Sequence, residues 1–488
     1  MFNITELTLR YYSIDKICKK FYLFKRVHDI FDIIYLGDFM KLSLMIFINK
    51  FITKVCKLFK RNGSVYPGYI IYDILKQKKI LEKVKYPKYV IAVTGSSGKG
   101  STTDVINHIL TNAGYDVCYN KNGSNGVLAA TTLILNNCNL KGKFLHDVLL
   151  LECDERHLKL IFGKNKMTHL IVTNVTRDQP ARNGDPDIVF NDILKAIGED
   201  TKLIVNSDDP LVNRLTYKFK NEYVTYGVSK TDDSYLKSSI DAVDYAYCPK
   251  CHTKLDYEFY HYGHIGHYSC PNCDFKRDKV DYEVTKVDFK NHSIKINGKD
   301  IYLDKDVLYA VYYTVAAYAL CKSIGLSDED LDKALNQNKK TSKRGKVLSL
   351  DGRSLTMLET KNENNLSYYQ SIRFIKNQSG KKTIILGFDN VSRRYQFNDL
   401  SWLWDVEFEL LNDKNIDKIF CIGRFRYDVI TRLEFAGIDK DKIVLVEDLN
   451  NLIKDVKENS VGDIYTMVCF DMTANILKLL EEDENEKN

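Results

Sequence analysis

The sequence lacks the features that would place it in several specialised classes of protein. Its first residues, MFNITELTLRYY, do not combine a basic stretch with an apolar core, so we expect no secretory signal. The most apolar segment, residues 41–59, carries Lys50, Lys54 and Lys57, which would be costly inside a bilayer. The net charge is only +6 over 488 residues, which argues against a dedicated nucleic-acid binder.

The segment over residues 41–59 predicts an amphipathic helix instead of a membrane span. Two interpretations stay open: a helix packed on the protein, or a helix resting on an anionic membrane surface as a peripheral contact. The residues before Met40 are either an appended helical piece or the result of the choice between Met1 and Met40 as the start.

A glycine-rich loop is the first clear functional signal. The stretch VIAVTGSSGKGSTTDVINHIL, residues 90–110, predicts a buried strand, a loop, and a helix that begins near Ser101. Glycines let backbone N–H groups converge on a phosphate, and the helix adds its positive end. Lys99 supplies a charge for the outer phosphates, and Ser101 or Thr102 a hydroxyl for Mg²⁺. We therefore predict that a nucleotide binds to Thr94, Gly95, Ser96, Ser97, Gly98, Lys99, Gly100, Ser101 and Thr102.

Polar residues follow the next predicted strands. Glu152 ends the strand VLLLE, where a carboxylate would face the ligand crevice of a parallel sheet and bind Mg²⁺ through oxygen. A polar cluster that includes Asn174 and Arg177 follows the strand HLIV. Asn206 and Asp209 follow the strand KLIV. Three polar strand ends in a row favour a site, and we expect Asn206 and Asp209 to contribute to nucleotide binding.

Four of the twelve cysteines form two C-x-x-C pairs, CPKC and CPNC. Each pair points two thiolates at one ion, so Cys248, Cys251, Cys270 and Cys273 predict a tetrahedral zinc site. Four protein ligands leave no open position, so the role is structural. The nearby His261, His264 and His267 are then packed or exposed residues rather than ligands. The other eight cysteines are scattered, as expected of reduced core residues in a cytoplasmic protein.

The length is too great for one hydrophobic core, while the 44% hydrophobic and 28% charged residues are typical of a globular protein. Short apolar strands alternate with helices from Tyr89 to about Gly227, and again from Gly345, which predicts two α/β domains with parallel sheets. We expect an N-terminal helical segment over 1–60, a central ATP-binding domain over 61–340, an inserted Cys₄ zinc ribbon over 246–280, and a C-terminal Rossmann-like α/β domain over 345–488.

Several motifs together resemble one family. From about residue 55 to about residue 480 the chain is similar to the MurT family, the Mur-ligase-like synthase subunits of lipid II isoglutaminyl synthase. The similarity lies in GSVYPG, KNGSNG, LECDE, TNVTRDQPARNGD, NSDDPLV, YGHIGHYSCPNC, DLSWLWDVEFE and RFRYDVITRLEFAGI. The loop GSSGKGST itself resembles the phosphate loops of the Mur ligase and folylpolyglutamate synthase superfamily.

The resemblance implies a reaction, its cofactors and a partner. The family uses ATP and Mg²⁺ to activate the α-carboxylate of D-glutamate in lipid II as an acyl phosphate. A GatD-type glutaminase then supplies ammonia, and D-isoglutamine forms at the inner face of the membrane. An aspartate of the family completes the partner's Cys–His pair. The matching residue is Asp399, with Asp405 as the second candidate. Asp399 also fits a helix N-cap.

The C-terminal half departs from the family pattern more than the phosphate loop does. The resemblance implies that Arg344, Lys361 and Asp389 approach the phosphates and the substrate carboxylate when the C-terminal domain closes over Mg·ATP. Two family asparagines, one of them expected near the adenine, are replaced by Ala310 and Tyr313. The string over residues 363–367 also differs.

Three functions therefore remain open on the sequence. The first is the amidating subunit of a peptidoglycan-precursor amidotransferase. The second is a Mur-type or folylpolyglutamate-type ligase that joins an amino acid without a partner. The third is a nucleotide-binding zinc-ribbon adaptor without catalysis. The Cys₄ ribbon and the string SWLWD favour the first.

Overall fold

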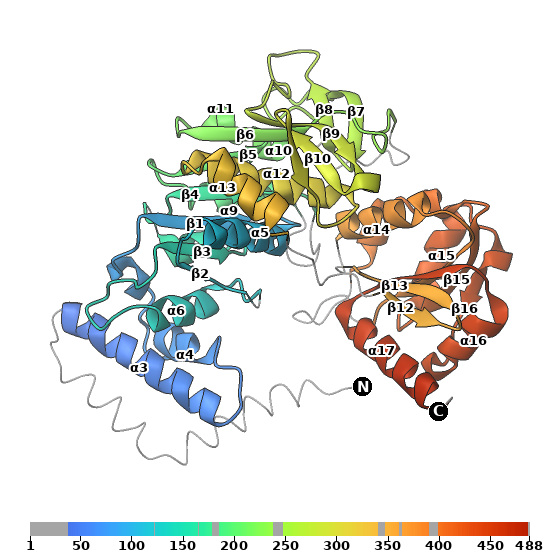
Figure 1. Cartoon of the computed structure of the whole chain (residues 1–488), viewed down its shortest axis with the longest axis horizontal. Coiled ribbons are helices and arrows are strands. Elements are labelled where there is room, and N and C mark those ends of the chain that lie inside the picture. The colour runs from blue at the N-terminus through green and yellow to red at the C-terminus, as the bar shows by residue number, and fades with distance from the viewer. Residues whose placement is uncertain are drawn as a thin grey trace.

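The computed structural model describes residues 38–121, 123–163, 165–177, 185–237, 247–339, 347–360, 364–389 and 399–486. The predicted site residues Arg344 and Lys361 and the segment 1–37 lie outside these ranges. Figure 1 shows two α/β lobes side by side, the second formed by the red C-terminal part of the chain. None of the helices in the described ranges combines the length and the apolar character that crossing a bilayer requires.

The larger lobe is built on a nine-stranded sheet. Its strands, in spatial order, are β11 (Lys299–Tyr302), β10 (Ser293–Ile296), β9 (Tyr282–Asp288), β6 (Tyr223–Val228), β5 (Lys202–Asn206), β4 (His169–Val172), β1 (Tyr89–Thr94), β3 (Val148–Glu152) and β2 (Val117–Tyr119). The strands from β2 to β9 pair in parallel, whereas β10 is antiparallel to both of its neighbours. The predicted parallel α/β architecture is confirmed.

Both faces of this sheet are buried, which explains why its strands are apolar runs instead of alternating patterns. In β1, Val90 and Ala92 pack into the core on one face, while Ile91 and Val93 pack into the core on the other. Figure 1 places α5 and α12 on one side of the sheet and α6 and α3 on the other. The carboxyl ends of the parallel strands are thereby left as the accessible edge of the sheet.

Three helices of this lobe, α3, α5 and α12, are longer than the others. The helices of the lobe are α3 (Asp38–Leu58), α4 (Tyr66–Tyr69), α5 (Lys99–Asn112), α6 (Val127–Asn136), α7 (Leu158–Phe162), α9 (Pro186–Leu194), α10 (Pro210–Asn213), α11 (Leu215–Lys218), α12 (Leu308–Ser323) and α13 (Asp328–Asp332). α3 forms an outer layer, because its Leu42, Met45 and Ile46 complete the core beneath α6. The helix predicted over residues 41–59 is therefore packed on the protein by one face.

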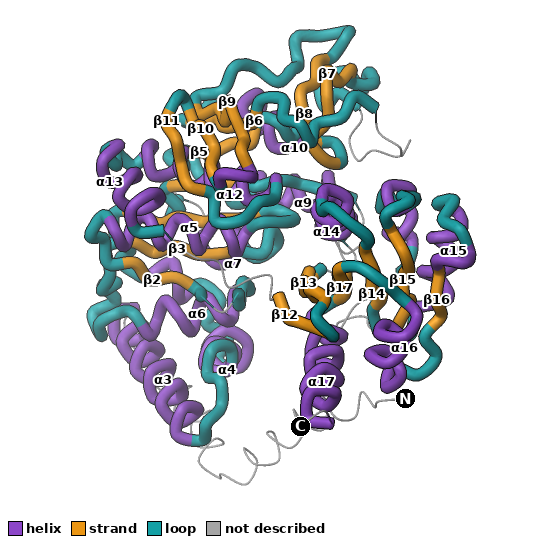
Figure 2. The backbone as a smooth tube through the Cα atoms, turned by 45° about the vertical axis from the view of Figure 1, so that its right-hand side comes forward, coloured by secondary structure: helices purple, strands orange, loops and turns teal. Residues whose placement is uncertain are grey.

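The cysteine-rich insertion contains the antiparallel hairpin β7 (Asp256–Tyr262) and β8 (Ile265–Ser269). Its small core includes Leu255, Tyr268 and Phe275 beside the cysteines. Figures 1 and 2 show this hairpin at the end of the lobe opposite to α3.

The second lobe contains a six-stranded sheet in the order β12 (Val347–Leu350), β13 (Arg353–Glu359), β17 (Asp463–Val468), β14 (Lys382–Gly387), β15 (Ile416–Ile422) and β16 (Ile443–Leu445). Only β12 is antiparallel to its neighbour. The helices are α14 (Asn365–Asn377), α15 (Arg426–Phe435), α16 (Leu452–Asn459) and α17 (Phe470–Glu486), with 3₁₀ turns η5 (Ser401–Asp405) and η6 (Phe408–Leu411).

Candidate active site

The glycine loop joins β1 to α5 in the geometry that phosphate binding requires. α5 begins at Lys99, two residues before the expected start, and Gly98 is its N-cap with φ +81°. Gly95 has φ +125°, and a Cβ placed there would lie 2.3 Å from Oγ1 of Thr173. Glycine is therefore required at residue 95 for both conformation and space, and at residue 98 for conformation alone.

The loop is held from below by the segment that follows β4. The N–H of Ser97 donates to Oδ1 of Asn174 at 3.0 Å, and the hydroxyl of Thr173 donates to the carbonyl of Ser97 at 2.6 Å. That segment is itself fixed by two fully buried side chains. Asn206 donates to the carbonyl of Thr173 at 2.9 Å, and Asp209 accepts from the N–H of Val175 at 2.8 Å.

Asn206 and Asp209 thus lie one layer behind the loop. Asp209 also caps α10, since it accepts from the N–H groups of Leu211 and Val212. Within the described residues, neither side chain lines the cavity in front of the loop. Their contacts position the segment that in turn positions the loop.

Lys99 points back over the loop to Glu155, in the turn after β3. Its Nζ donates to the carbonyl of Gly95 and, at 3.0 Å, to Oε1 of Glu155. The same Oε1 accepts from the N–H of Gly95 at 3.1 Å. The Glu155 side chain is buried, and the Lys99 side chain is only 11% exposed. A largely buried ion pair is sensitive to the loss of one partner, so Glu155 holds Nζ of Lys99 close to the place of the phosphates.

Glu152 lies at the carboxyl end of β3, as the sequence predicts. Its Oε1 accepts from Nδ2 of Asn125 at 3.3 Å, and its backbone N–H and C=O both bond to the side chain of Asn120. Asn125, in the motif KNGSNG, therefore lies beside Glu152. A carboxylate oriented by amides next to the loop is a suitable oxygen ligand for Mg²⁺.

A cavity of about 610 Å³ opens directly in front of the loop. One wall comes from the loop and α5, through Ser97, Gly98, Gly100, Ser101 and Thr102. The opposite wall comes from the C-terminal lobe and contains Thr356, Met357, Ser367, Gln370, Ser371 and Phe374, among others. A ligand in this cavity would contact both lobes, which is how closure of one lobe on the other would complete a site.

A second cavity, of about 690 Å³, lies near the opposite end of β1, around Tyr89, Tyr115 and His146. No residue of the glycine loop lines it. The strand carboxyl ends and the helix N-terminus both face the first cavity, so the first cavity is the nucleotide candidate.

Tyrosines form the side of the first cavity that α12 provides. Tyr309, Tyr312 and Tyr313 all line it. The hydroxyl of Tyr313 donates to Oδ1 of Asp304. Ala310, by contrast, is fully buried in the core. Of the two positions where the family pattern has asparagine, residue 313 therefore faces the cavity and residue 310 does not.

The three candidate aspartates of the C-terminal lobe have different surroundings. Asp389 accepts from the N–H of Arg424 at 2.9 Å. Asp399 accepts from the N–H of Ser401 at 2.9 Å, just before η5. Asp405, whose side chain is only 13% exposed, accepts from Nη1 of Arg177 at 2.8 Å. Asp405 is therefore engaged with the central lobe.

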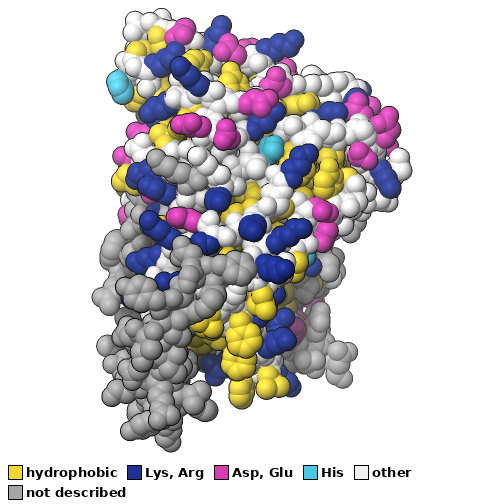
Figure 3. Space-filling model, turned by 90° about the vertical axis from the view of Figure 1, so that its left-hand side faces the viewer, with side chains coloured by type: hydrophobic (Ala, Val, Ile, Leu, Met, Phe, Trp, Pro, Cys, Tyr) yellow, Lys and Arg dark blue, Asp and Glu magenta, His cyan; other side chains and the backbone are white. Residues whose placement is uncertain are grey.

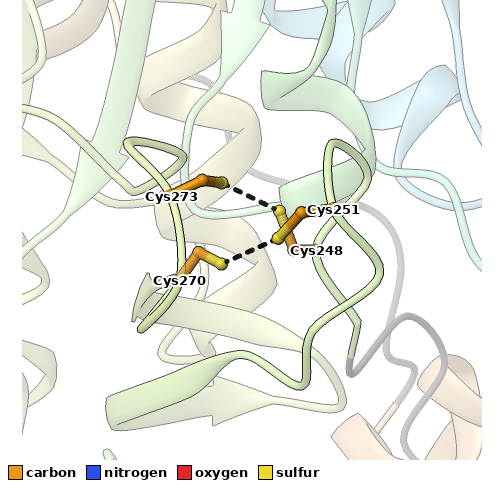
Figure 4. A group of neighbouring side chains, drawn as sticks. All are labelled: Cys248, Cys251, Cys270 and Cys273. Atoms are coloured by element: carbon orange, nitrogen blue, oxygen red, sulfur yellow. Dashed lines mark hydrogen bonds between the residues drawn. The ribbon is translucent and has the colours of Figure 1, made fainter.

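The four cysteines converge as the sequence predicts (Figure 4). Their sulfur atoms all lie within 4.8 Å of one another, with Cys248 Sγ 3.5 Å from Cys273 Sγ and Cys251 Sγ 3.4 Å from Cys270 Sγ. A disulfide would need a separation of about 2.05 Å. Four sulfurs around a tetrahedral zinc at about 2.3 Å would lie about 3.8 Å apart, so the cluster fits one ion.

The backbone around the cysteines suits thiolates. The N–H of Lys250 and the N–H of Asn272 each point at a cysteine sulfur, at 3.4 Å in both cases. The hydrogen bond with the Thr253 hydroxyl lowers the pKa of Cys251 to about 5, whereas burial raises the pKa values of Cys248 and Cys273. Hydrogen bonds to the charged form of a thiol favour that form, which is the form that binds metal.

Two of the histidines between the cysteine pairs, His261 and His264, are buried, and the cysteine cluster in the described residues contains no histidine. His264 Nε2 lies 3.2 Å from Oδ1 of Asp209, and His261 Nε2 lies 3.0 Å from the carbonyl of Val228. Burial lowers the pKa of His261. Together with the hydrogen bond from Tyr268 to the carbonyl of Ser207, these contacts dock the hairpin onto the segment after β5 and the end of β6.

The sequence placed Glu155 among the carboxylates after the strand VLLLE without indicating its role, and it did not predict the tyrosine wall. Glu155 was visible in the string LECDE, but the end of a strand is an easier signal than a residue in the following turn. Tyr309 carries no signal of its own, because a tyrosine in an apolar helix predicts core packing.

Comparison with known proteins identifies relatives of both lobes. Residues 93–273 match the Mur ligase middle domain family, and residues 362–472 match the MurT ligase C-terminal family. The chain is 26% identical, over 407 residues, to the lipid II isoglutaminyl synthase (glutamine-hydrolyzing) subunit MurT of Staphylococcus aureus. That alignment covers 82% of this chain and 89% of the relative.

Solved structures share the fold. A pseudomurein peptide ligase type C from Methanothermus fervidus superposes with a TM-score of 0.60 and 18% identity, covering 84% of this chain and 81% of the other. MurF ligase from Thermotoga maritima, in complex with ADP, superposes with a TM-score of 0.55 and 17% identity, covering 85% of each chain.

Proposed function

We propose that the chain amidates the α-carboxylate of D-glutamate in the stem peptide of lipid II. The premise is that it belongs to the MurT branch of the Mur ligase superfamily, whose members are ATP-dependent ligases. The observation that carries the proposal is the glycine loop, which opens into a cavity walled by both lobes. A reaction between a triphosphate and a carboxylate needs both reactants held in one enclosed space.

The central lobe would bind ATP through the loop residues Thr94–Thr102. Phosphate binding would draw Lys99 from Glu155 toward the outer phosphates, while the N–H groups at the start of α5 meet the inner ones. Ser101 and Glu152 would hold Mg²⁺. That ion, when bound, neutralises charge on the phosphates as the substrate carboxylate attacks. Tyr309 and Tyr313 would contact the adenine in place of the family's amide.

The C-terminal lobe would complete the site on closing. Arg344 and Lys361 are the proposed cations for the charge that develops as the carboxylate becomes an acyl phosphate. Asp389 would orient them or the incoming amine. Ammonia then displaces the phosphate, which leaves as inorganic phosphate, and an amide is formed.

We further propose that ammonia comes from a GatD-type glutaminase bound to the C-terminal lobe. Asp399 would fix the tautomer of the partner's catalytic histidine and stabilise its charged form. The ion pair of Asp405 with Arg177 supports this choice, since Asp405 already has a charged partner in the same chain. The substrate is lipid-linked, so the reaction would take place at the inner face of the membrane.

The cysteine cluster would hold Zn²⁺ in a structural role. The fit of four sulfurs to one ion supports the metal, and the docking of the hairpin onto Ser207 and Asp209 supports the role. Zinc with four thiolate ligands keeps no open position for chemistry.

The experiment is reconstitution with a co-expressed GatD-type glutaminase, lipid II, ATP and glutamine. We expect ADP release that depends on lipid II, and a product with an amide in place of the D-glutamate α-carboxylate by mass spectrometry. A purified complex that binds no ATP, or that releases ADP without modifying lipid II, would contradict the proposal.

A further inference from the structure

The outward face of α3 exposes several large apolar side chains close together. Phe47 and Phe51 are each 58% exposed, and Leu58 and Phe59 are 79% and 69% exposed. The rings of Phe47 and Phe51 stack with centroids 6.4 Å apart. Large apolar side chains exposed together indicate an interaction site.

These side chains share one face because of helical periodicity. Phe47, Phe51, Lys54 and Leu58 follow one another at spacings of four, three and four residues, so they form a single stripe. The residues that pack inward, such as Leu42, Met45, Ile46 and Asn49, lie on the opposite side. α3 therefore has an inner face that packs against α6 and an outer face that is exposed.

The inner face is fixed by directional contacts as well as by burial. Nδ2 of Asn49 donates to the carbonyl of Thr132 and to Oδ1 of Asn136, both at 3.0 Å. Nζ of Lys50 donates to the carbonyl of Cys138 at 2.6 Å. The helix thus cannot rotate to hide its phenylalanines without losing buried hydrogen bonds.

The charge around the stripe is of one sign. From Phe39 to Tyr72 the sequence holds five lysines and one arginine, and no aspartate or glutamate. Lys54, Lys57, Lys60 and Arg61 are exposed. Figure 3 shows hydrophobic side chains gathered with Lys and Arg side chains at the lower end of this face, where Figure 1 places α3.

We propose that the apolar side chains of the stripe, Phe47, Phe51 and Leu58, together with Phe59 just after α3 and the flanking cations, dock the protein on an anionic lipid bilayer. Aromatic side chains suit the region of the lipid headgroups, and each Lys or Arg near an anionic surface adds attraction. A helix with charges this frequent does not cross the bilayer; it lies in the interface. The proposal is independent of the ligase reaction, because vesicle binding requires neither ATP nor lipid II.

The test is co-sedimentation of the full chain with two kinds of vesicle, pure phosphatidylcholine and an equal mixture of phosphatidylcholine and phosphatidylglycerol. We expect binding to the mixed vesicles that weakens with added salt, and little binding to the neutral ones. The double variant Phe47→Gln, Phe51→Gln should bind the mixed vesicles at least about tenfold more weakly, because the apolar surface of two phenyl rings is no longer transferred from water into the bilayer.

The charge variant Lys54→Glu, Lys57→Glu should lose about thirtyfold or more in affinity, from about 1 kcal/mol for each cation. The matched control is Lys286→Glu, Lys290→Glu on β9 and the turn after it, which should bind as the wild type does. The melting temperature of each variant is measured as a control, and we expect it to match that of the wild type.

Three results would overturn the proposal. One is a wild-type chain that stays in the supernatant with both vesicles. Another is binding to both vesicles alike. The last is a wild-type dimer in sedimentation velocity that Phe47→Gln, Phe51→Gln converts to monomer, which would assign the stripe to a second copy of the chain.

Discussion

The guanidinium of Arg177, in the central lobe, lies 2.8 Å from the carboxylate of Asp405, in the C-terminal lobe. Arg177 belongs to the segment after β4 whose Thr173 and Asn174 hold the glycine loop. The ion pair therefore joins the support of the phosphate site to the lobe that forms the other wall of the cavity. We therefore expect the pair to couple closure of the lobes to the loop.

Removing this pair should loosen closure without unfolding either lobe. The Arg177 side chain is 37% exposed, so we expect a cost of about 1 kcal/mol and a fall of about fivefold in the ADP-release rate for Arg177→Ala. ATP affinity should change less, because the loop itself is intact. The measurement is steady-state ADP release with ammonia and lipid II, beside ATP binding by calorimetry.

The control is Lys195→Ala, which breaks an ion pair of 2.7 Å with Asp192 within the central lobe. It should leave the rate unchanged. The charge swap Arg177→Asp with Asp405→Arg should recover part of the lost rate. Equal rates for Arg177→Ala and the wild type would mean that the pair is a surface contact without influence on closure.

The two candidate aspartates for the partner's glutaminase can be separated by the source of nitrogen. Asp399→Asn should abolish glutamine-dependent amidation of the reconstituted complex, yet leave amidation by added ammonium salts intact, because only the partner's histidine loses its support. Asp405→Asn should lower both activities by a similar factor, since it acts on closure. The reverse pattern would assign the partner's triad to Asp405.

The sequence predicted the parts of the fold that depend on local patterns. The apolar runs of β1, β3, β4 and β5 were sufficient, because strands buried on both faces carry no alternation to confuse with other structures. The C-x-x-C pairs were sufficient for the cysteine cluster, since the spacing itself forces two sulfurs together. The glycines of the loop predicted a phosphate-binding turn between a strand and a helix, and the structure has that turn, with positive φ angles at residues 95 and 98.

The sequence could not predict contacts that depend on how distant segments meet. Asn206 and Asp209 ended a strand at the expected edge, but only the fold shows that both are fully buried behind the loop. Nothing local relates Glu155 to Lys99, or Arg177 to Asp405. Which face of α3 is packed and which is exposed likewise depends on the side that α6 covers. The sequence therefore left open both a helix packed on the protein and a helix resting on a membrane surface, and the structure shows one packed face and one exposed face.

Variants of the ion pair between Lys99 and Glu155 allow the stability of the fold and the binding of ATP to be measured as separate effects. Lys99→Met should abolish ATP binding and also lower stability by about 3 kcal/mol, because the Glu155 carboxylate is left buried without its charge partner. The double variant Lys99→Met, Glu155→Gln should regain most of that stability and still bind no ATP. Urea unfolding and calorimetry measure the two effects. Recovered ATP binding in the double variant would show that Lys99 does not contact the nucleotide.

The cysteine cluster should contain metal in the protein as purified. We expect one zinc per chain by mass spectrometry of the metal content, and loss of that zinc in Cys270→Ser with a lower melting temperature. Cys421→Ser, in the apolar strand β15, is the matched control and should keep the zinc. Because the hairpin docks onto Ser207, weaker ATP binding should accompany zinc loss. Full stability in the presence of a strong chelator would argue against a structural ion.

His169 should give the protein a specific sensitivity to acid. It lies buried at the start of β4, and burial lowers its pKa to about 4, with Lys202 adding to the effect. In the unfolded chain the pKa is about 6.5, so the unfolded state binds the proton first as the pH falls. The contribution to stability is therefore complete above pH 6.5 and is lost on acidification toward pH 4. Between pH 7.5 and pH 5 the loss should be about 2 kcal/mol, and His169→Gln should remove that part of the pH dependence. Urea midpoints of both proteins at the two pH values measure it, and parallel changes would rule His169 out as the source.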